Sequence, residues 1–136
     1  MSHDHSFNVI CPYCNAKAEL ASSTRVYGGQ DYGMIWLCSN YPTCDAFVGV
    51  HKGTTRPLGR LANKELRHWK KQAHFYFDLR WKHEKKRKPA RTAAYRWLAT
   101  QLGISAHDCH IGMFDVETCK QVVKICMANS KKREAA

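Results

Sequence analysis

Four cysteines in the first third of the chain place the strongest constraint on its fold. Cys11-Pro-Tyr-Cys14 is a C-x2-C pair, and after 23 intervening residues Cys38 and Cys44 form a C-x5-C pair. Such pairs on tight turns are typical of structural zinc sites, because backbone amides can donate to the thiolates and two turns complete a tetrahedral shell. Four protein ligands leave no position for water. We therefore expect one structural Zn²⁺ on Cys11, Cys14, Cys38 and Cys44; the alternative is two unrelated thiol pairs.

Short strand-like segments surround these cysteines, and a Gly28-Gly29 turn separates two of them. Together with the metal they predict a zinc ribbon of short antiparallel strands over residues 7–50. The segments are Ala18–Leu20, Arg25–Tyr27, Met34–Leu37 and Asp45–Val50.

Turn-forming residues over 51–62 predict a linker or an ordered crossover, and residues 63–129 predict a basic helical region. The whole chain is thus expected to be α+β. Three helices are predicted: one from an Asn63 cap towards Lys88, ending before Pro89; one over Thr92–Leu102, closed by Gly103; and one over Val116–Ala128, capped by Asp115. A frayed tail is expected over 130–136.

Charge is distributed unevenly along the chain, which has a formal net charge of +11. Residues 1–50 contain two basic and four acidic side chains, a net charge of −2, whereas residues 51–136 contain twenty Lys and Arg against seven acids, a net charge of +13. This asymmetry favours a polyanionic partner, with a solvated helix face as the alternative. The candidate phosphate contacts are Lys70, Lys71, Lys82, Lys85, Lys86, Arg87, Lys88 and Arg91.

The cysteine segments resemble a known family. Cys-Pro-x-Cys followed by Cys38-Ser-Asn-Tyr-Pro-Thr-Cys44 is similar to the C-terminal zinc fingers of type IA DNA topoisomerases, over residues 9–50. In that family, aromatic and basic side chains of the finger bind single-stranded DNA. The resemblance therefore implies base contacts by Arg25, Tyr27, Tyr32, Trp36 and Tyr41. Burial in the small core is the alternative for the aromatic residues. Nothing in the chain resembles the catalytic domain of those enzymes.

The whole chain also resembles a group of small zinc-finger-containing proteins found in bacterial, phage and prophage genomes. The resemblance depends on the ribbon and on the segments Pro57–Asn63, Ala94–Ala99 and His110–Asp115. It implies a mobile-element setting but names no reaction.

The residue types raise two further candidate sites. Cys109, His110, Cys119 and Cys126 could form a second metal site, although buried thiols also serve as small hydrophobic residues. His74 and Asp78 share one helix face, and His68, His83, His110 and Asp115 could extend them into a metal-dependent catalytic site. No nuclease signature is completed, so we expect no enzymatic activity and interpret His74 and Asp78 as a structural pair.

These observations predict a zinc-stabilised protein that binds nucleic acid, DNA more than RNA, with little sequence preference. The alternative is a phage-encoded inhibitor or adaptor that binds an acidic host protein. Seven cysteines, an odd number, favour a reducing compartment. No apolar run reaches about 18 residues, and Met1–His5 does not begin a secretion signal. A cytoplasmic protein without membrane contact is therefore expected.

Overall fold

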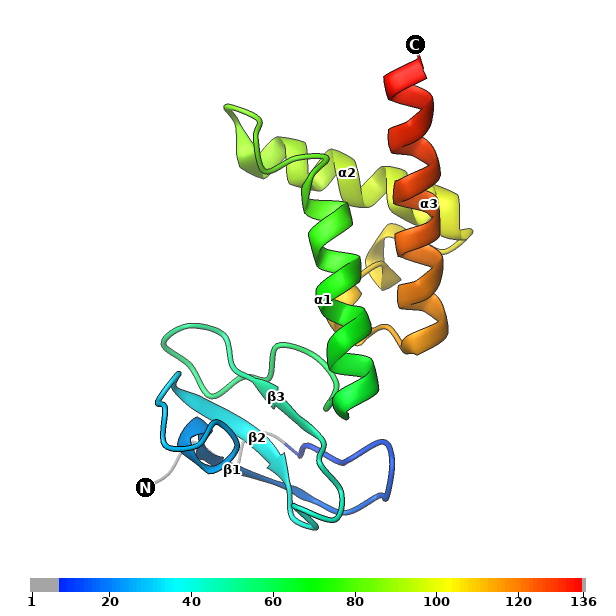
Figure 1. Ribbon diagram of the computed structural model, residues 1–136. Helices are drawn as coiled ribbons and strands as arrows, with labels where there is room; N and C mark the ends of the chain where they lie inside the picture. Colours follow the sequence, from blue (N-terminus) through cyan, green and yellow to red (C-terminus); the bar gives the residue numbers. More distant parts are fainter. Residues whose placement is uncertain (1–7, 136) are drawn as a thin grey trace. The chain divides into compact units, whose positions relative to one another are not determined.

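The protein folds into a small antiparallel sheet followed by three helices (Figure 1). The structure, a computed structural model, describes the backbone of residues 8–135 and the side chains of residues 8–129. Two compact units divide the chain, Met1–Glu65 and Leu66–Ala136. From the sequence, their net charges are +1 and +10. The expected α+β fold with an N-terminal ribbon is confirmed.

The sheet of the first unit has the strand order β1-β2-β3, with β1 at Ala18–Ser22, β2 at Met34–Cys38 and β3 at Phe47–Gly49. All pairings are antiparallel. Four of the five residues of the central strand, β2, are buried. Its side chains alternate, so Trp36 and Cys38 belong to one core cluster and Ile35 and Leu37 to another.

The prediction of a strand over Arg25–Tyr27 is wrong. Ser23–Arg25 instead forms a short 3-10 helix, η2, because the Ser22 hydroxyl accepts a hydrogen bond from the Thr24 amide at 3.2 Å and caps the turn. The connection to β2 then runs through three glycines with positive φ, at 28, 29 and 33.

Residues 51–62 fold back onto the sheet. Isolated bridges pair Val50 with Pro57 and Phe47 with Ala62, and Leu61 is completely enclosed in the cluster around Trp36. The indole Nε1 of Trp36 donates to the Thr55 carbonyl at 2.7 Å. This segment is therefore an ordered crossover that encloses one face of the ribbon.

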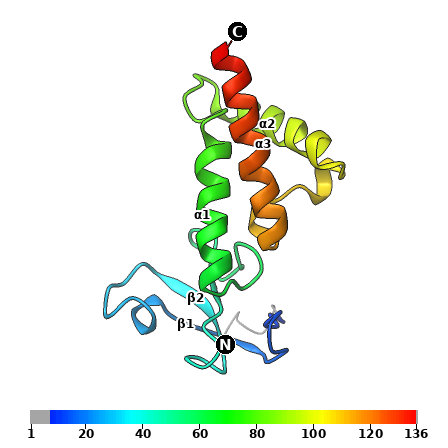
Figure 2. The ribbon, with the colours of Figure 1, turned by 45° about the vertical axis from the view of Figure 1, so that its right-hand side comes forward.

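The second unit is built on α1 (Lys64–Asp78), α2 (Arg87–Leu102) and α3 (Val116–Ala135). Both ribbon views show α1 and α3 side by side, with α2 running across them (Figures 1 and 2). Short 3-10 turns, η3 (Ala106–Asp108) and η4 (Ile111–Met113), connect α2 to α3. The core of this unit includes the fully enclosed side chains of Leu66, Phe77, Leu98, Ile111 and Val122.

The predicted end of α2 and the predicted start of α3 agree with the structure, whereas α3 runs beyond its predicted end at Ala128. Gly103 closes α2 in the left-handed conformation (φ 72°), and the Asp115 carboxylate accepts from the Thr118 amide at 2.9 Å. The backbone of α3 continues to Ala135, where a frayed tail was expected; Ala136 lies outside the described residues.

The prediction that α1 reaches towards Lys88 is wrong, because it ends at Asp78. There the Asp78 carboxylate accepts from Trp81 Nε1 at 3.1 Å, and its carbonyl accepts from the Trp81 and Lys82 amides, which turns the chain. Pro89 does not stop α1; it lies in the first turn of α2, where its missing N–H costs no hydrogen bond. The second helix thus begins five residues before the predicted Thr92. In the part of the chain that the structure describes, no helix has the length and apolar character needed to cross a membrane.

Candidate metal centre and nucleic-acid interface

The four predicted ligands converge at one end of the ribbon. The Sγ atoms of Cys11, Cys14, Cys38 and Cys44 all lie within 4.8 Å of one another. Cys11 and Cys44 are separated by 3.6 Å between sulfurs, and Cys14 and Cys38 by 3.4 Å. A tetrahedral zinc with Zn–S bonds of about 2.3 Å requires sulfurs about 3.8 Å apart. These cysteines therefore fit one Zn²⁺, and a site with four thiolates is structural.

Hydrogen bonds to the sulfurs support the ionised ligands. The Asn40 amide donates to Cys38 Sγ and the Asn40 side chain donates to Cys14 Sγ, both at 3.4 Å. A hydrogen bond from the Ala16 backbone, followed by those from Asn40 and Cys38, lowers the pKa of the exposed Cys14 thiol to about 6. Burial instead raises the pKa of Cys38, to about 12, and also that of Cys44. Enclosed thiols of this kind are ionised when a cation compensates for their lost hydration.

The three remaining cysteines lie in the core of the helical unit. Cys109, Cys119 and Cys126 are buried, and burial raises the pKa of Cys109 and that of Cys126, the latter to about 11. His110 is exposed. Among the described residues, the four N-terminal cysteines are the sole group of three or more Cys, His, Asp or Glu side chains with metal-binding geometry. The buried cysteines are thus used here as small hydrophobic residues.

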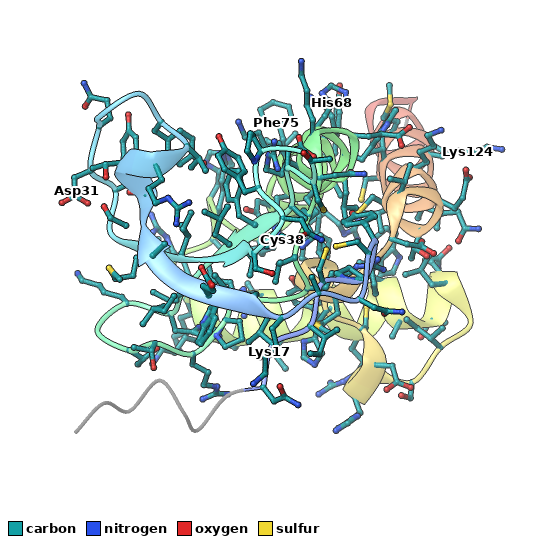
Figure 3. The ribbon with its side chains drawn as sticks, turned by 90° about the horizontal axis from the view of Figure 1, so that it is seen from below. Lys17, Asp31, Cys38, His68, Phe75 and Lys124 are labelled. Carbon is teal, nitrogen blue, oxygen red and sulfur yellow. The ribbon has the colours of Figure 1, made fainter. Side chains whose placement is uncertain are left out.

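Three of the residues considered for catalysis, His74, Asp78 and Asp115, are half-buried or take part in local hydrogen bonds. Burial lowers the pKa of His74, against the opposing influence of the Asp78 carboxylate, which itself accepts from Trp81. Asp115 caps α3. Figure 3 shows His68 on the outer side of α1.

The ribbon aromatics divide into exposed and buried groups. Tyr32 is 72% exposed and Tyr27 is 44% exposed, with ring centroids 5.1 Å apart in an edge-to-face pair. Tyr41 is half-buried against the cluster of Ile35, Leu37 and Phe47. The prediction that Trp36 contacts nucleic acid is wrong, because it is 3% exposed and bonded to Thr55. Arg25 is exposed at the end of η2.

An open groove of about 970 Å³ lies beside Tyr27 and Tyr32, with a mostly apolar lining. Met34 and Leu58 contribute exposed apolar side chains, and Lys52 and Arg56 also line it. The sequence missed these four residues, since Lys52, Arg56 and Leu58 fall in a segment with no periodic pattern. Asp31 directly precedes Tyr32 in the connection that leads into β2, and Figure 3 shows it well apart from Cys38. The groove and the metal centre therefore occupy different ends of β2.

The predicted basic residues lie on separate elements of the helical unit. Lys70, half-buried, and Lys71, exposed, lie on α1. Lys82 lies in the turn after it, with its ammonium 6.0 Å from the centroid of the Phe75 ring. The remaining candidates, all exposed, form one continuous stretch through the end of this turn and the first turns of α2: Lys85, Lys86, Arg87, Lys88 and Arg91.

Comparison with known proteins supports the assignment of the metal centre. A family model described as a zinc-finger-containing domain matches residues 7–129, nearly the whole chain. Searches of curated proteins and of solved structures return no match. The match includes all four clustered cysteines, α1, α2 and most of α3. This chain therefore belongs to the zinc-finger-containing domain family.

Proposed function

We propose that this protein binds nucleic acid, DNA in preference to RNA, with little sequence preference, in the setting of a phage or another mobile element. The observation on which the proposal rests is the basic stretch Lys85–Lys88 with Arg91. All five side chains are exposed, and within the described residues none of them has a carboxylate partner. Cations without acidic partners on a surface are available for phosphate groups.

The position of these cations adds to the argument. Lys86 is the N-cap of α2, with no side-chain hydrogen bond to the helix, and Arg87 and Lys88 are its first two residues. The first turn contains no acidic residue. The N-terminal end of a helix is positive, so cations here are locally unfavourable unless an anion binds. A phosphate would compensate both the lysines and the free backbone amides.

The ribbon groove supplies a second type of contact. Tyr27 and Tyr32 present exposed rings, and any base offers a face on which such a ring can stack. Lys52 and Arg56 line the same groove and could pair with phosphates beside the stacked bases. Stacking without hydrogen-bond readout of base edges supports binding with little sequence preference.

Fluorescence anisotropy with labelled single-stranded DNA, duplex DNA and RNA, across a salt series, tests the proposal. Substitution of all four residues Lys85–Lys88 by Gln should weaken binding and flatten the plot of log affinity against log salt, by about 0.9 for each duplex phosphate that is no longer neutralised. The matched control removes four cations elsewhere and should retain most of the affinity; its substitutions are Lys17→Gln, Lys64→Gln, Lys120→Gln and Lys124→Gln.

Equal reductions of affinity in the two variants would show that total charge, not the basic stretch, determines binding. Absence of binding to every nucleic acid at about 50 mM salt would overturn the proposal, because non-specific binders are tightest at low salt. An acidic host protein would then be the partner to seek.

A further inference from the structure

A cleft of about 220 Å³ lies between α2 and the η3 turn of the helical unit. Its polar lining consists of Arg91, Thr92, Arg96 and His110, and Tyr95 and the buried Cys109 also line it. Of these, Arg91 alone was expected to bind a phosphate. The cleft adjoins the basic stretch, since Arg91 belongs to both.

Local structure fixes these side chains on two facing elements. Positions 91, 92, 95 and 96 of α2 lie on one face because they are related by steps of three and four residues, 92 to 95, 91 to 95 and 92 to 96. Opposite them, the Ser105 hydroxyl caps η3 by accepting from the Asp108 amide at 3.2 Å. His110 lies two residues after this turn and is the N-cap of η4. The candidate donors thus lie on α2 and beside the turn η3, which Ser105 caps.

The lining of the cleft has an excess of positive charge. None of its lining residues is acidic. The nearest carboxylate in sequence, Asp108, lies within 3.4 Å of the Ser105 hydroxyl and the His107 ring. The Arg91 guanidinium lies 4.9 Å from the centroid of the Tyr95 ring, which orients it. Neither Arg91 nor Arg96 has an ion pair within the described residues.

We infer that this cleft binds a phosphomonoester. Two guanidinium groups recognise phosphate oxygens through paired hydrogen bonds, and Thr92 and His110 offer further donors. A monoester carries a charge of about −1.5 to −2 near pH 7, which matches two arginines better than the single charge of an internal diester.

Two sources provide this group: the terminal phosphate of a nucleic-acid strand and a free nucleotide. The strand end is the source that rests on the proposed function, since the basic stretch beside the cleft would hold the preceding phosphates. A nucleoside monophosphate has the same chemistry without the strand.

The experiment compares a single-stranded DNA oligonucleotide with its 5′-phosphorylated and 3′-phosphorylated forms, with deoxyadenosine monophosphate as a third ligand. One form should bind about tenfold to a hundredfold tighter than the unphosphorylated strand, the effect of one or two charge-assisted hydrogen bonds. Arg96→Gln should abolish this preference and leave the affinity for the unphosphorylated strand within about twofold. Lys124→Gln, at an exposed site on α3, is the matched control and should retain the preference.

Nuclear magnetic resonance locates the site independently of affinity. Titration with the monophosphate should shift the amide signals of Arg96 and His110 in the unmodified protein and not in Arg96→Gln. Shifts without a strand-end preference would support the cleft with the free nucleotide as its ligand. Equal affinity for all three oligonucleotides, together with unchanged signals at both residues, would overturn the inference. The proposed function is tested separately, by the unphosphorylated strand.

Discussion

The two units of this chain stabilise themselves in different ways. The ribbon has two small clusters, centred on Trp36 and on Leu37, and four cysteines that bind zinc. The helical unit has large enclosed side chains such as Phe77, Leu98 and Val122, and its core contains none of the four metal ligands. The ribbon encloses fewer large side chains than the helical unit, so the metal supplies what its core lacks.

The cysteines of the two units show how a metal ligand differs from a core residue. Cys38 in the ribbon and Cys119 in the helical unit are equally hidden from solvent, so burial does not separate metal ligands from core residues. What separates them is the approach of three other sulfurs and of donating amides such as that of Asn40. Spacing in the sequence indicates that convergence, whereas burial does not.

The largest expected effect is on the metal centre. Cys14→Ser should release zinc and unfold the ribbon, because structural zinc sites contribute on the order of 10 kcal/mol to folding. The helical unit should retain its helices, since its core contains none of the ligands. Zinc content by mass spectrometry and far-ultraviolet circular dichroism measure the two effects.

Cys126→Ala is the matched control for this variant, because it removes a buried thiol from α3 and should leave one zinc per chain. Retention of zinc by Cys14→Ser would contradict the four-cysteine assignment.

The second prediction concerns a substitution in the core of the helical unit. Phe77→Ala should lower the free energy of unfolding of the helical unit by about 3–5 kcal/mol, because it leaves a cavity beside Tyr95, whose ring centroid is 4.5 Å away. Zinc content should not change. Urea unfolding followed by circular dichroism gives the free energy.

Phe75→Ala controls for removal of the same side chain at an exposed site of the same helix, labelled in Figure 3. Its effect should stay within about 0.5 kcal/mol. Zinc release from Phe77→Ala would show that the two units do not unfold separately.

Much of this architecture could be predicted from local signals. The cysteine spacing predicted the metal site, Asp115 predicted the start of α3, and Gly103 predicted the end of α2. The end of α1 could not be predicted, because Pro89 was interpreted as a stop for the helix before it and instead lies in the first turn of the next helix. The helix ends instead at Asp78, where its carboxylate accepts a hydrogen bond from the Trp81 side chain, and the sequence pattern does not indicate that contact.

The sequence left core burial of Trp36 as an alternative to base contact, and it could not decide between them for a different reason. An aromatic residue in an isolated ribbon has one exposed face, and its burial here depends on residues 51–62 folding back with Thr55 as its hydrogen-bond partner. That segment has no periodic pattern from which such a contact could be inferred. The same segment, expected to be a linker or an ordered crossover, supplies Lys52, Arg56 and Leu58 to the groove, so the path of this one segment accounts for both differences.

The third prediction concerns the exposed aromatics of the groove. Tyr32→Ala should weaken binding of single-stranded DNA by about 1–3 kcal/mol, the contribution of one stacked base. Stability should change little, because the Tyr32 amide is held by Ser23 Oγ at 2.7 Å independently of the ring. Tyr32→Phe keeps the ring and should keep the affinity. A decrease of affinity in Tyr32→Phe equal to that in Tyr32→Ala would show that the hydroxyl, not stacking, makes the contact.

The smallest expected effect tests whether the basic stretch lowers the stability of the helical unit while it strengthens nucleic-acid binding. Lys88→Glu places a carboxylate in the first turn of α2, near the positive end of the helix, and should stabilise the helical unit by about 0.3–1 kcal/mol. The same substitution should weaken nucleic-acid binding, because it replaces a phosphate contact with a repulsive charge.

Lys124→Glu makes the same charge change in the interior of α3, distant from either helix end, and should show neither effect. Thermal unfolding and anisotropy on both variants measure the pair. If Lys88→Glu left both stability and binding unchanged, the cations at the start of α2 would be an ordinary solvated surface, and the helical unit would differ from the ribbon in charge without differing in function.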